Sequence, residues 1–220
     1  MASMLEQVSN DFAAAVEGVS PAVVRVDARR RFPASGVVWS SDGVIVTTHH
    51  VVRREEGITV GLADGRIVAA TLVARDPSTD LAVLRAEVDG LTPPAWADDT
   101  ALRVGQLVLA VGRPDEGLQA SLGVISTLDG AWRSPAGGQI ERYVQSDLTM
   151  YPGFSGGALV GAAGDVIGVN TSALLRGASV TIPASTLQRV VEALQAHGRV
   201  RRGYLGIGSQ PVRLPDALAN

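Results

Sequence analysis

Apolar residues through most of the chain form short runs that turn residues interrupt. The turn Ser-Asp-Gly at residues 41–43 separates two such runs, and Asp-Gly at residues 64–65 separates another two. Short apolar or alternating runs between turn signals are typical of β-strands. Strands are predicted at residues 23–26, 37–39, 44–47, 58–62, 67–73, 81–84, 107–111, 122–125, 140–144, 158–160, 166–169 and 179–182. Many short strands with glycine-rich turns indicate an all-β barrel or sandwich.

Helical spacing of apolar residues occurs only near the two ends of the chain. The first predicted helix covers residues 5–16, and Gly18 and Pro21 end its pattern. The second covers residues 185–197, where Ser185 and Gln188 have the spacing of a capping box and Gly198 ends the pattern. The segment 91–96, which contains two prolines, is the predicted connection between two halves of the β region.

Composition restricts the class of protein. The 220 residues are 46% hydrophobic with 25 glycines and 11 prolines, which fits a globular chain rich in turns. The net charge of −3 argues against a nucleic-acid partner, and the basic run at residues 29–31 is interpreted as a solvated strand end. No apolar run approaches the ~18 residues that span a bilayer. The first residues lack the pattern of a signal peptide, which leaves open an upstream segment that was removed.

Absent residue types restrict the chemistry further. The chain has no cysteine, and all 19 basic residues are arginine. Thiolate nucleophiles, disulfides, serine–lysine dyads, Schiff bases and Walker A loops are therefore excluded. No cofactor and no metal site are expected.

One serine lies among three glycines in the stretch Tyr-Pro-Gly-Phe-Ser-Gly-Gly-Ala-Leu at residues 151–159. A serine hydroxyl is a useful nucleophile only when a base takes its proton and donors stabilise the oxyanion. Glycines permit a tight loop whose N–H groups converge on one point. A glycine turn between two strands is the alternative. The choice depends on a histidine and an acid elsewhere in the chain.

Three histidines could supply the base. His197 falls in the last turn of the second predicted helix, where a cation favours the helix dipole, so a structural role is expected. His49 and His50 follow the strand at 44–47 and can face a cleft, with surface residues or a weak metal site as alternatives. Asp80 opens the strand at 81–84 and could orient an imidazole, with a turn aspartate as the alternative. The order His, Asp, Ser is one of those known for catalytic triads.

Three blocks of the sequence together resemble the catalytic blocks of the HtrA/Deg serine proteases, which are chymotrypsin-like. They are residues 47–52, 76–84 and 145–159, and residues 166–171 and 182–185 resemble further blocks in the right order. The resemblance implies a trypsin-like double β-barrel with an N-terminal and a C-terminal helix. It divides the chain into a helical segment 1–19, a protease domain 20–200 and a tail 201–220. Within the domain, barrels at about 20–96 and 97–184 precede the helix 185–197.

The resemblance also implies roles for individual residues. His50 matches the general base, Asp80 the orienting acid and Ser155 the nucleophile, and the N–H groups of Gly153 and Ser155 match the oxyanion hole. His49 stands where the family usually has a small residue and receives no role. Substrate contacts are expected from Thr149, Met150, Asn170 and Thr171. Neither Thr149 nor Met150 is acidic, which disfavours cleavage after basic residues and favours medium apolar ones.

Phe154 departs from the family pattern, which has a polar residue, usually Asn, at this position. A phenyl ring cannot make the polar contacts that order such a loop. The departure therefore suggests a loop that is mispositioned at rest and activated by a ligand, with an inactive relative as the alternative.

The segment Arg-Gly-Tyr-Leu-Gly-Ile at residues 202–207 resembles the family's entry into a PDZ domain, whose loop binds a peptide C-terminus. The resemblance implies a PDZ domain in the full-length protein and a homotrimer to which the helix at 5–16 could contribute. The family occurs mostly in the periplasm and cell envelope, while a cytoplasmic location stays open.

The resulting hypothesis is a serine endopeptidase that hydrolyses unfolded or damaged proteins in protein quality control. Its partners would be unfolded polypeptides. A catalytically silent polypeptide-binding protein of the same fold is the first alternative, and a metal protein that uses His49 and His50 is the second.

Overall fold

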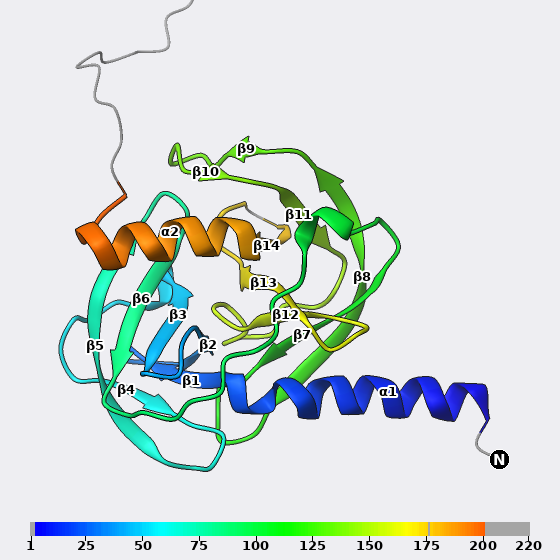
Figure 1. Ribbon diagram of the computed structural model, residues 1–220, viewed down its shortest axis with the longest axis horizontal. Helices are drawn as coiled ribbons and strands as arrows, with labels where there is room; N and C mark the ends of the chain where they lie inside the picture. The colour runs from blue at the N-terminus through cyan, green and yellow to red at the C-terminus, as the bar shows by residue number, and fades with distance from the viewer. Residues whose placement is uncertain (1–2, 176, 201–220) are drawn as a thin grey trace, which may run out of the picture.

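Two closed β-barrels of six strands each form the body of the molecule (Figure 1). A computed structural model describes residues 3–175 and 177–200. The first barrel has the order β1-β2-β3-β6-β5-β4, with β1 Val23–Asp27, β2 Ala34–Val38, β3 Val44–Thr48, β4 Ile58–Gly61, β5 Ile67–Asp76 and β6 Leu81–Ala86. The second has the order β11-β14-β13-β12-β7-β8, with β7 Leu107–Gly112, β8 Gln119–Asp129, β11 Tyr143–Ser146, β12 Ala158–Gly161, β13 Val166–Thr171 and β14 Ser179–Pro183. The expected all-β double barrel is confirmed.

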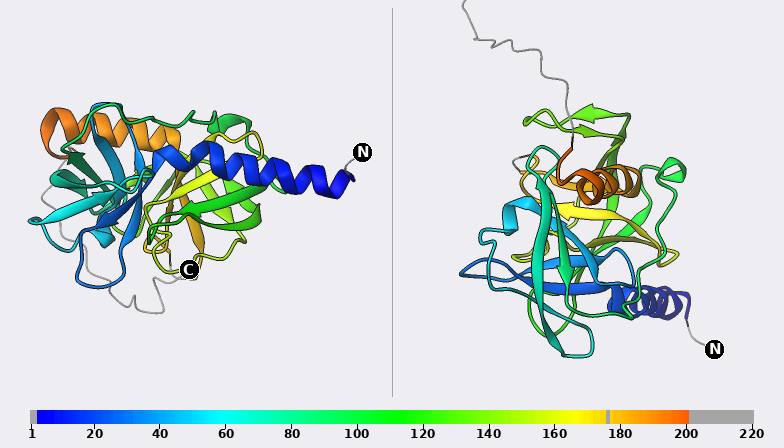
Figure 2. Two further views of the ribbon diagram at one scale, coloured as in Figure 1. Left: turned by 90° about the horizontal axis from the view of Figure 1, so that it is seen from below. Right: turned by 60° about the vertical axis from the view of Figure 1, so that its left-hand side comes forward.

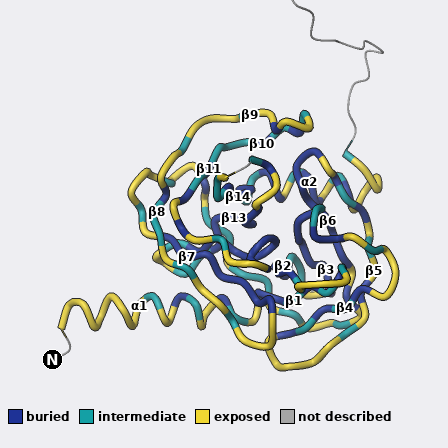
Figure 3. Tube along the Cα trace, turned by 180° about the vertical axis from the view of Figure 1, so that it is seen from behind, coloured by how far each residue is buried: buried dark blue, intermediate teal, exposed yellow. Residues whose placement is uncertain are grey.

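Burial along the strands follows their place in the two barrels. Every residue of β2, β3 and β13 is buried, whereas β4 alternates between buried and half-buried positions. Alternation is typical of a strand with one solvated face, and continuous burial requires cover on both faces. Figure 3 shows this buried centre where the two barrels meet. The strands that end at this centre therefore carry the side chains of the site.

Strand pairing brings together segments that are distant in sequence. Thr48 at the end of β3 pairs with Leu81 at the start of β6, which puts the residues just beyond β3 beside those just before β6. In the second barrel, Ala158 at the start of β12 pairs with Val169 near the end of β13. The serine loop precedes β12, so it lies next to the end of β13.

Helix α1, Met4–Val19, begins earlier and ends later than the predicted helix at 5–16. Ser3 and Glu6 form a capping box at its start, which satisfies two of the otherwise unpaired N–H groups. The helix projects beyond the barrels (Figure 2), and Met4 and Leu5 are more than four-fifths exposed. None of the helices in the described part of the chain is long and apolar enough to cross a membrane.

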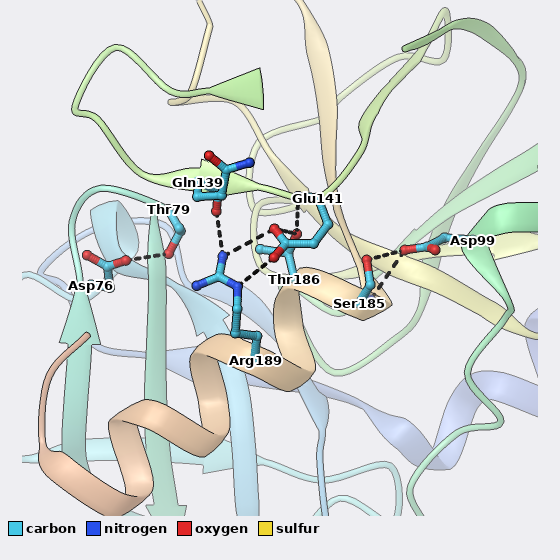
Figure 4. A network of polar contacts seen from close by, with 8 residues as sticks. All are labelled: Asp76, Thr79, Asp99, Gln139, Glu141, Ser185, Thr186 and Arg189. Carbon is cyan, nitrogen blue, oxygen red and sulfur yellow. Dashed lines mark hydrogen bonds and ion pairs between the residues drawn. The ribbon is translucent and has the colours of Figure 1, made fainter. Parts of the chain in front are cut away.

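Helix α2, Ala184–His197, packs against β5 and β6 of the first barrel and β13 and β14 of the second. The predicted end at Gly198 is confirmed, since this residue caps the helix with φ of 66°. The predicted Ser185 capping box is wrong, because Pro183 is the N-cap and no side chain caps the helix. The Ser185 hydroxyl instead donates to Asp99, 2.5 Å away, in the connection between the barrels (Figure 4).

A small hairpin beside α2 corrects the strand predicted at residues 140–144. The chain forms β9, Trp132–Arg133, and β10, Gln139–Ile140, and β11 starts only at Tyr143. Between β10 and β11, Glu141 accepts a hydrogen bond of 2.7 Å from Arg189 of α2. The same arginine also donates to the Gln139 carbonyl (Figure 4). These contacts with the helix draw the chain out of the strand pattern that local spacing predicts.

Residues 91–96 lie between β6 and β7, so they belong to the connection between the barrels. The rings of Trp39 and Trp96 are 5.2 Å apart, which ties this connection to the first barrel. The tail at 201–220, with its predicted PDZ start, lies outside the described residues.

Candidate active site

A histidine and an aspartate meet where β3 ends and β6 begins. His50 lies in the short 3₁₀ helix His49–Val51 that follows β3. Its Nδ1 is 2.8 Å from Oδ2 of Asp80, and its backbone N–H donates to Oδ1 of the same carboxylate at 2.9 Å. The carboxylate therefore holds both the ring and the backbone of His50, and it selects the tautomer with a proton on Nδ1.

Asp80 is only 4% exposed, and a second side chain completes its environment. The hydroxyl of Thr171, at the end of β13 in the other barrel, donates to Oδ2 at 2.6 Å. The backbone of Asp80 has φ of 57°, a left-handed conformation that Asp tolerates better than most residues. Three hydrogen bonds in a buried place thus satisfy this carboxylate and orient it toward His50.

Ser155 lies just before β12, and its side chain opens into the same cavity as that of His50. This cavity of about 320 Å³ is lined by Arg29, Phe32, His50, Met150, Tyr151, Pro152, Gly153, Ser155 and Ser172. The Ser155 hydroxyl is 3.0 Å from the hydroxyl of Ser172. No hydrogen bond joins Ser155 to His50 in the described structure. Catalytic hydrogen bonds are often long or absent without substrate, so this arrangement fits a resting site.

Contacts with the first barrel hold the loop at residues 153–155. The Ser35 hydroxyl donates to the Gly153 carbonyl at 2.7 Å, and the Ser35 N–H donates to the Ser155 carbonyl at 3.2 Å. Gly153 has φ of 91°, and a Cβ there would lie 2.5 Å from Cβ of Pro114, so only glycine fits. Within the described residues, the N–H groups of Gly153 and Ser155 have no acceptor. Both donors are free to bind an oxyanion.

The Phe154 side chain turns away from the cavity and is completely buried in the second barrel. It belongs to an apolar cluster that also contains Val108, Ala110, Ile125, Val144, Leu148, Leu159 and Ile167. The Tyr151 ring packs edge-on against it, with centroids 5.4 Å apart. Burying a phenyl ring stabilises by about 2–3 kcal/mol, so apolar packing holds the middle of this loop.

His49 faces a different environment from His50. Burial is the main cause that lowers the pKa of His49 below its usual value, and the Arg75 and Arg53 guanidinium groups contribute. Its Nδ1 is buried without a hydrogen-bond partner in the described structure. Among the described residues, no three His, Asp or Glu side chains gather where they could hold a metal ion. Within the described residues, His49 and His50 therefore have no third side chain beside them that could complete a metal site.

The four expected substrate-contact residues lie in different surroundings. Met150 lines the cavity, whereas Thr149 does not, and the backbone N–H of Thr149 is bonded to Ser121. The Asn170 side chain is buried and bonded to the Ala158 carbonyl, and Thr171 is turned toward Asp80. Neither Asn170 nor Thr171 lines the cavity.

Sequence reasoning missed two serines of the site. Ser35 stands before an apolar run and Ser172 after one, so neither belongs to a motif that distinguishes it from an ordinary strand end. Their contacts with the loop at 153–155 span 118 and 17 positions of the chain. Only the folded arrangement reveals them.

Comparisons with known proteins identify the family of this chain. The sequence profile described as "Trypsin-like peptidase domain" matches residues 34–169. A probable periplasmic serine endoprotease, DegP-like, from Halomonas elongata is 39% identical over 83% of this chain and 39% of its own length. Serine endoprotease DegS from Haemophilus influenzae is 34% identical over 90% of this chain and 64% of its own. The chain thus spans less than two thirds of these curated relatives.

Solved structures of related proteases are also similar to this chain. The crystal structure of Deg5 superposes with a TM-score of 0.78 at 32% identity, covering 89% of this chain and 99% of that one. The profile match covers more than half of the chain, and the TM-score shows that this chain and Deg5 share one fold. The chain therefore belongs to the trypsin-like peptidase domain family, within its HtrA/Deg group of serine proteases.

Proposed function

We propose that this chain is a serine endopeptidase in which Ser155, His50 and Asp80 act as nucleophile, general base and orienting acid. The observation that carries the proposal is that His50, which is hydrogen-bonded to Asp80, lines one cavity with Gly153 and Ser155, whose N–H groups have no acceptor among the described residues. An oriented base beside a serine and two free N–H donors supports acyl transfer, once the Ser155 hydroxyl turns toward His50.

The mechanism follows from these positions. The Ser155 hydroxyl turns from Ser172 toward His50, which takes its proton as Oγ bonds to the substrate carbonyl carbon. Asp80 stabilises the imidazolium that forms. The N–H groups of Gly153 and Ser155 bind the oxyanion, and loss of one such donor typically costs about 3–4 kcal/mol. His50 then protonates the leaving amine as the C–N bond breaks, and water releases the acyl group by the same steps.

Thr171 is proposed as a positioning residue for Asp80. Replacing it with valine keeps the shape but removes the 2.6 Å hydrogen bond to Oδ2, together with the 3.1 Å bond that the hydroxyl accepts from the Ala173 N–H. Hydrogen bonds to charged groups contribute about 1.5–3 kcal/mol, so kcat is expected to fall by roughly ten-fold or more with little change in KM. Steady-state kinetics on a fluorogenic peptide measures both constants.

The matched control is Thr181→Val. Thr181 is also buried, and its hydroxyl donates to Asn170 at 2.9 Å rather than to Asp80. Equal losses of kcat in the two variants would contradict a role that acts through Asp80.

The proposed substrates are unfolded or damaged polypeptides. The cavity of about 320 Å³ is open to solvent but has room for only a few side chains, so a substrate must enter as an extended segment. Met150 and Tyr151 give one wall an apolar character, which supports cleavage after medium apolar residues.

The test uses one protein in two states. A disulfide-bonded substrate protein is expected to resist digestion in its native form. After reduction and alkylation it should be digested at least about ten-fold faster, because the rate of proteolysis follows the fraction of molecules that are unfolded. Gel densitometry and mass spectrometry give rate and cleavage sites. Equal rates for both forms, or dominant cleavage after Arg and Lys, would contradict these substrate assignments.

A polypeptide-binding protein without catalysis is the second candidate. The bond between Ser155 and Ser172, in place of one to His50, is the observation that favours it. Binding of the reduced substrate without any new peptides would support this candidate over the endopeptidase.

A further inference from the structure

The loop between β1 and β2 forms one wall of the catalytic cavity, and it is strongly basic. It contains the run Arg29-Arg30-Arg31-Phe32, and both Arg29 and Phe32 line the cavity. Arg30 and Arg31 lie between them and are exposed. Phe32 is 71% exposed with φ of 54°, at the tip of the loop. The basic run is exposed at Arg30 and Arg31, as expected of a solvated strand end, and its first residue, Arg29, also lines the cavity.

A fourth arginine lies beside this loop. The backbone N–H of Arg53 donates to the Ala28 carbonyl at 2.9 Å, directly at the base of the loop. Burial lowers the pKa of Arg29, and the neighbouring charge of Arg53 lowers it further. We call residues Arg29, Arg30, Arg31 and Arg53 the basic rim.

Nearby acidic side chains do not neutralise the basic rim. Asp27 pairs with Arg54 at 3.3 Å and with Arg25 at 3.5 Å, and Glu55 pairs with Arg75 at 2.6 Å. In the described part of the chain, no member of the basic rim has an ion-pair partner. The chain as a whole carries a net charge of −3, so this positive region is local.

No Asp or Glu is among the described residues that line the cavity. Met150, Tyr151, Pro152 and Gly153 form an uncharged wall. The Asp80 carboxylate is buried and already accepts hydrogen bonds from His50 and Thr171. Among the described residues that line the cavity, the arginine that a peptide meets is Arg29, on the first-barrel side.

We propose that the basic rim selects polypeptide segments that carry Asp or Glu after the scissile bond. This inference rests on the proposed endopeptidase function. Met150, the expected contact of the residue before the scissile bond, belongs to the second barrel, whereas the rim belongs to the first. A chain that enters at Met150 and passes Ser155 brings the residues that follow the scissile bond against the rim. Carboxylates there pair with guanidinium groups, which suit bidentate contacts.

The experiment compares two quenched fluorescent peptides that differ only in the second and third residues after the cleaved bond, Glu-Glu in one and Gln-Gln in the other. For the unmodified chain, kcat/KM is expected to be about three- to ten-fold higher for the Glu-Glu peptide, the range of one or two exposed ion pairs. This ratio should fall toward one near 1 M salt, where the Debye length is about 3 Å.

The variant Arg30→Gln/Arg31→Gln should bring the ratio close to one while the rate on the Gln-Gln peptide stays unchanged. The matched control is Arg133→Gln/Arg199→Gln, which removes two exposed charges that do not line the cavity and should keep the full ratio. A ratio near one for the unmodified chain overturns the inference, as does an equal loss in the control.

If the endopeptidase assignment is wrong, neither peptide is cut, and this result is distinct from equal cleavage of both peptides. Fluorescence anisotropy with the Ser155→Ala chain still compares the binding of the two peptides in that case. Tighter binding of the Glu-Glu peptide, lost in the rim variant, supports the inference, and equal binding overturns it.

Discussion

Replacing Ser155 with alanine is expected to abolish digestion of unfolded casein and labelling by a fluorophosphonate. A nucleophile and its base act as a unit, so the loss in kcat should be on the order of a million-fold. The fold should tolerate the change, because within the described residues the hydroxyl has one hydrogen bond, to the exposed Ser172, and such bonds contribute about 1 kcal/mol. Gel assays of casein and in-gel fluorescence of the probe measure the two activities.

Ser172→Ala is the matched control, since it breaks the same 3.0 Å contact from the other side and leaves the nucleophile in place. It should retain both labelling and digestion. Retention of either activity in purified Ser155→Ala would remove Ser155 as the nucleophile. Casein binding without digestion by the unmodified chain would instead support the polypeptide-binding alternative.

Replacing Phe154 with alanine is expected to lower the free energy of unfolding by about 3–5 kcal/mol, the range for large-to-small changes at buried aromatic positions. The ring is completely buried in the second barrel and supports Tyr151. The same change should slow fluorophosphonate labelling, even where the variant is fully folded, because the flanking N–H groups of Gly153 and Ser155 lose their anchor. Urea denaturation and labelling rates measure the two effects.

Two further substitutions separate packing from polarity at this position. Phe154→Leu keeps an apolar side chain and should retain most of the stability and the labelling rate. Phe154→Asn introduces the residue usual in the family into a cluster of apolar side chains, so the buried amide should be at least as damaging as alanine. Normal labelling by Phe154→Asn would show that burial of the ring does not hold the loop.

The buried ring changes how the departure at Phe154 is interpreted. The sequence suggested that the loop lacks the polar contacts that order it. In the structure, apolar packing of Phe154 and the Ser35 bond to the Gly153 carbonyl hold the loop. We therefore expect labelling of Ser155 without any activating peptide.

Much of the fold could be predicted from local pattern. Periodicity located most strands and both helices, because alternation and helical spacing report which face of an element is buried. It failed where distant contacts override local preference. Ser185 has the spacing of a capping box, yet its hydroxyl donates to Asp99, 86 positions away. The strand predicted at 140–144 is interrupted where Glu141 contacts Arg189 of α2.

Residue composition limits the chemistry that this chain can perform. The chain has no cysteine, no lysine and three histidines. Few side chains could therefore act as the base for a serine among glycines. The tertiary structure alone decided which groups meet. It turned His50 rather than His49 toward Asp80, brought Thr171 to that carboxylate from 91 positions away, and placed Arg29 of the basic run in the wall of the cavity. The reason is physical: such contacts arise where two barrels close against each other, and local residue patterns carry no information about that packing.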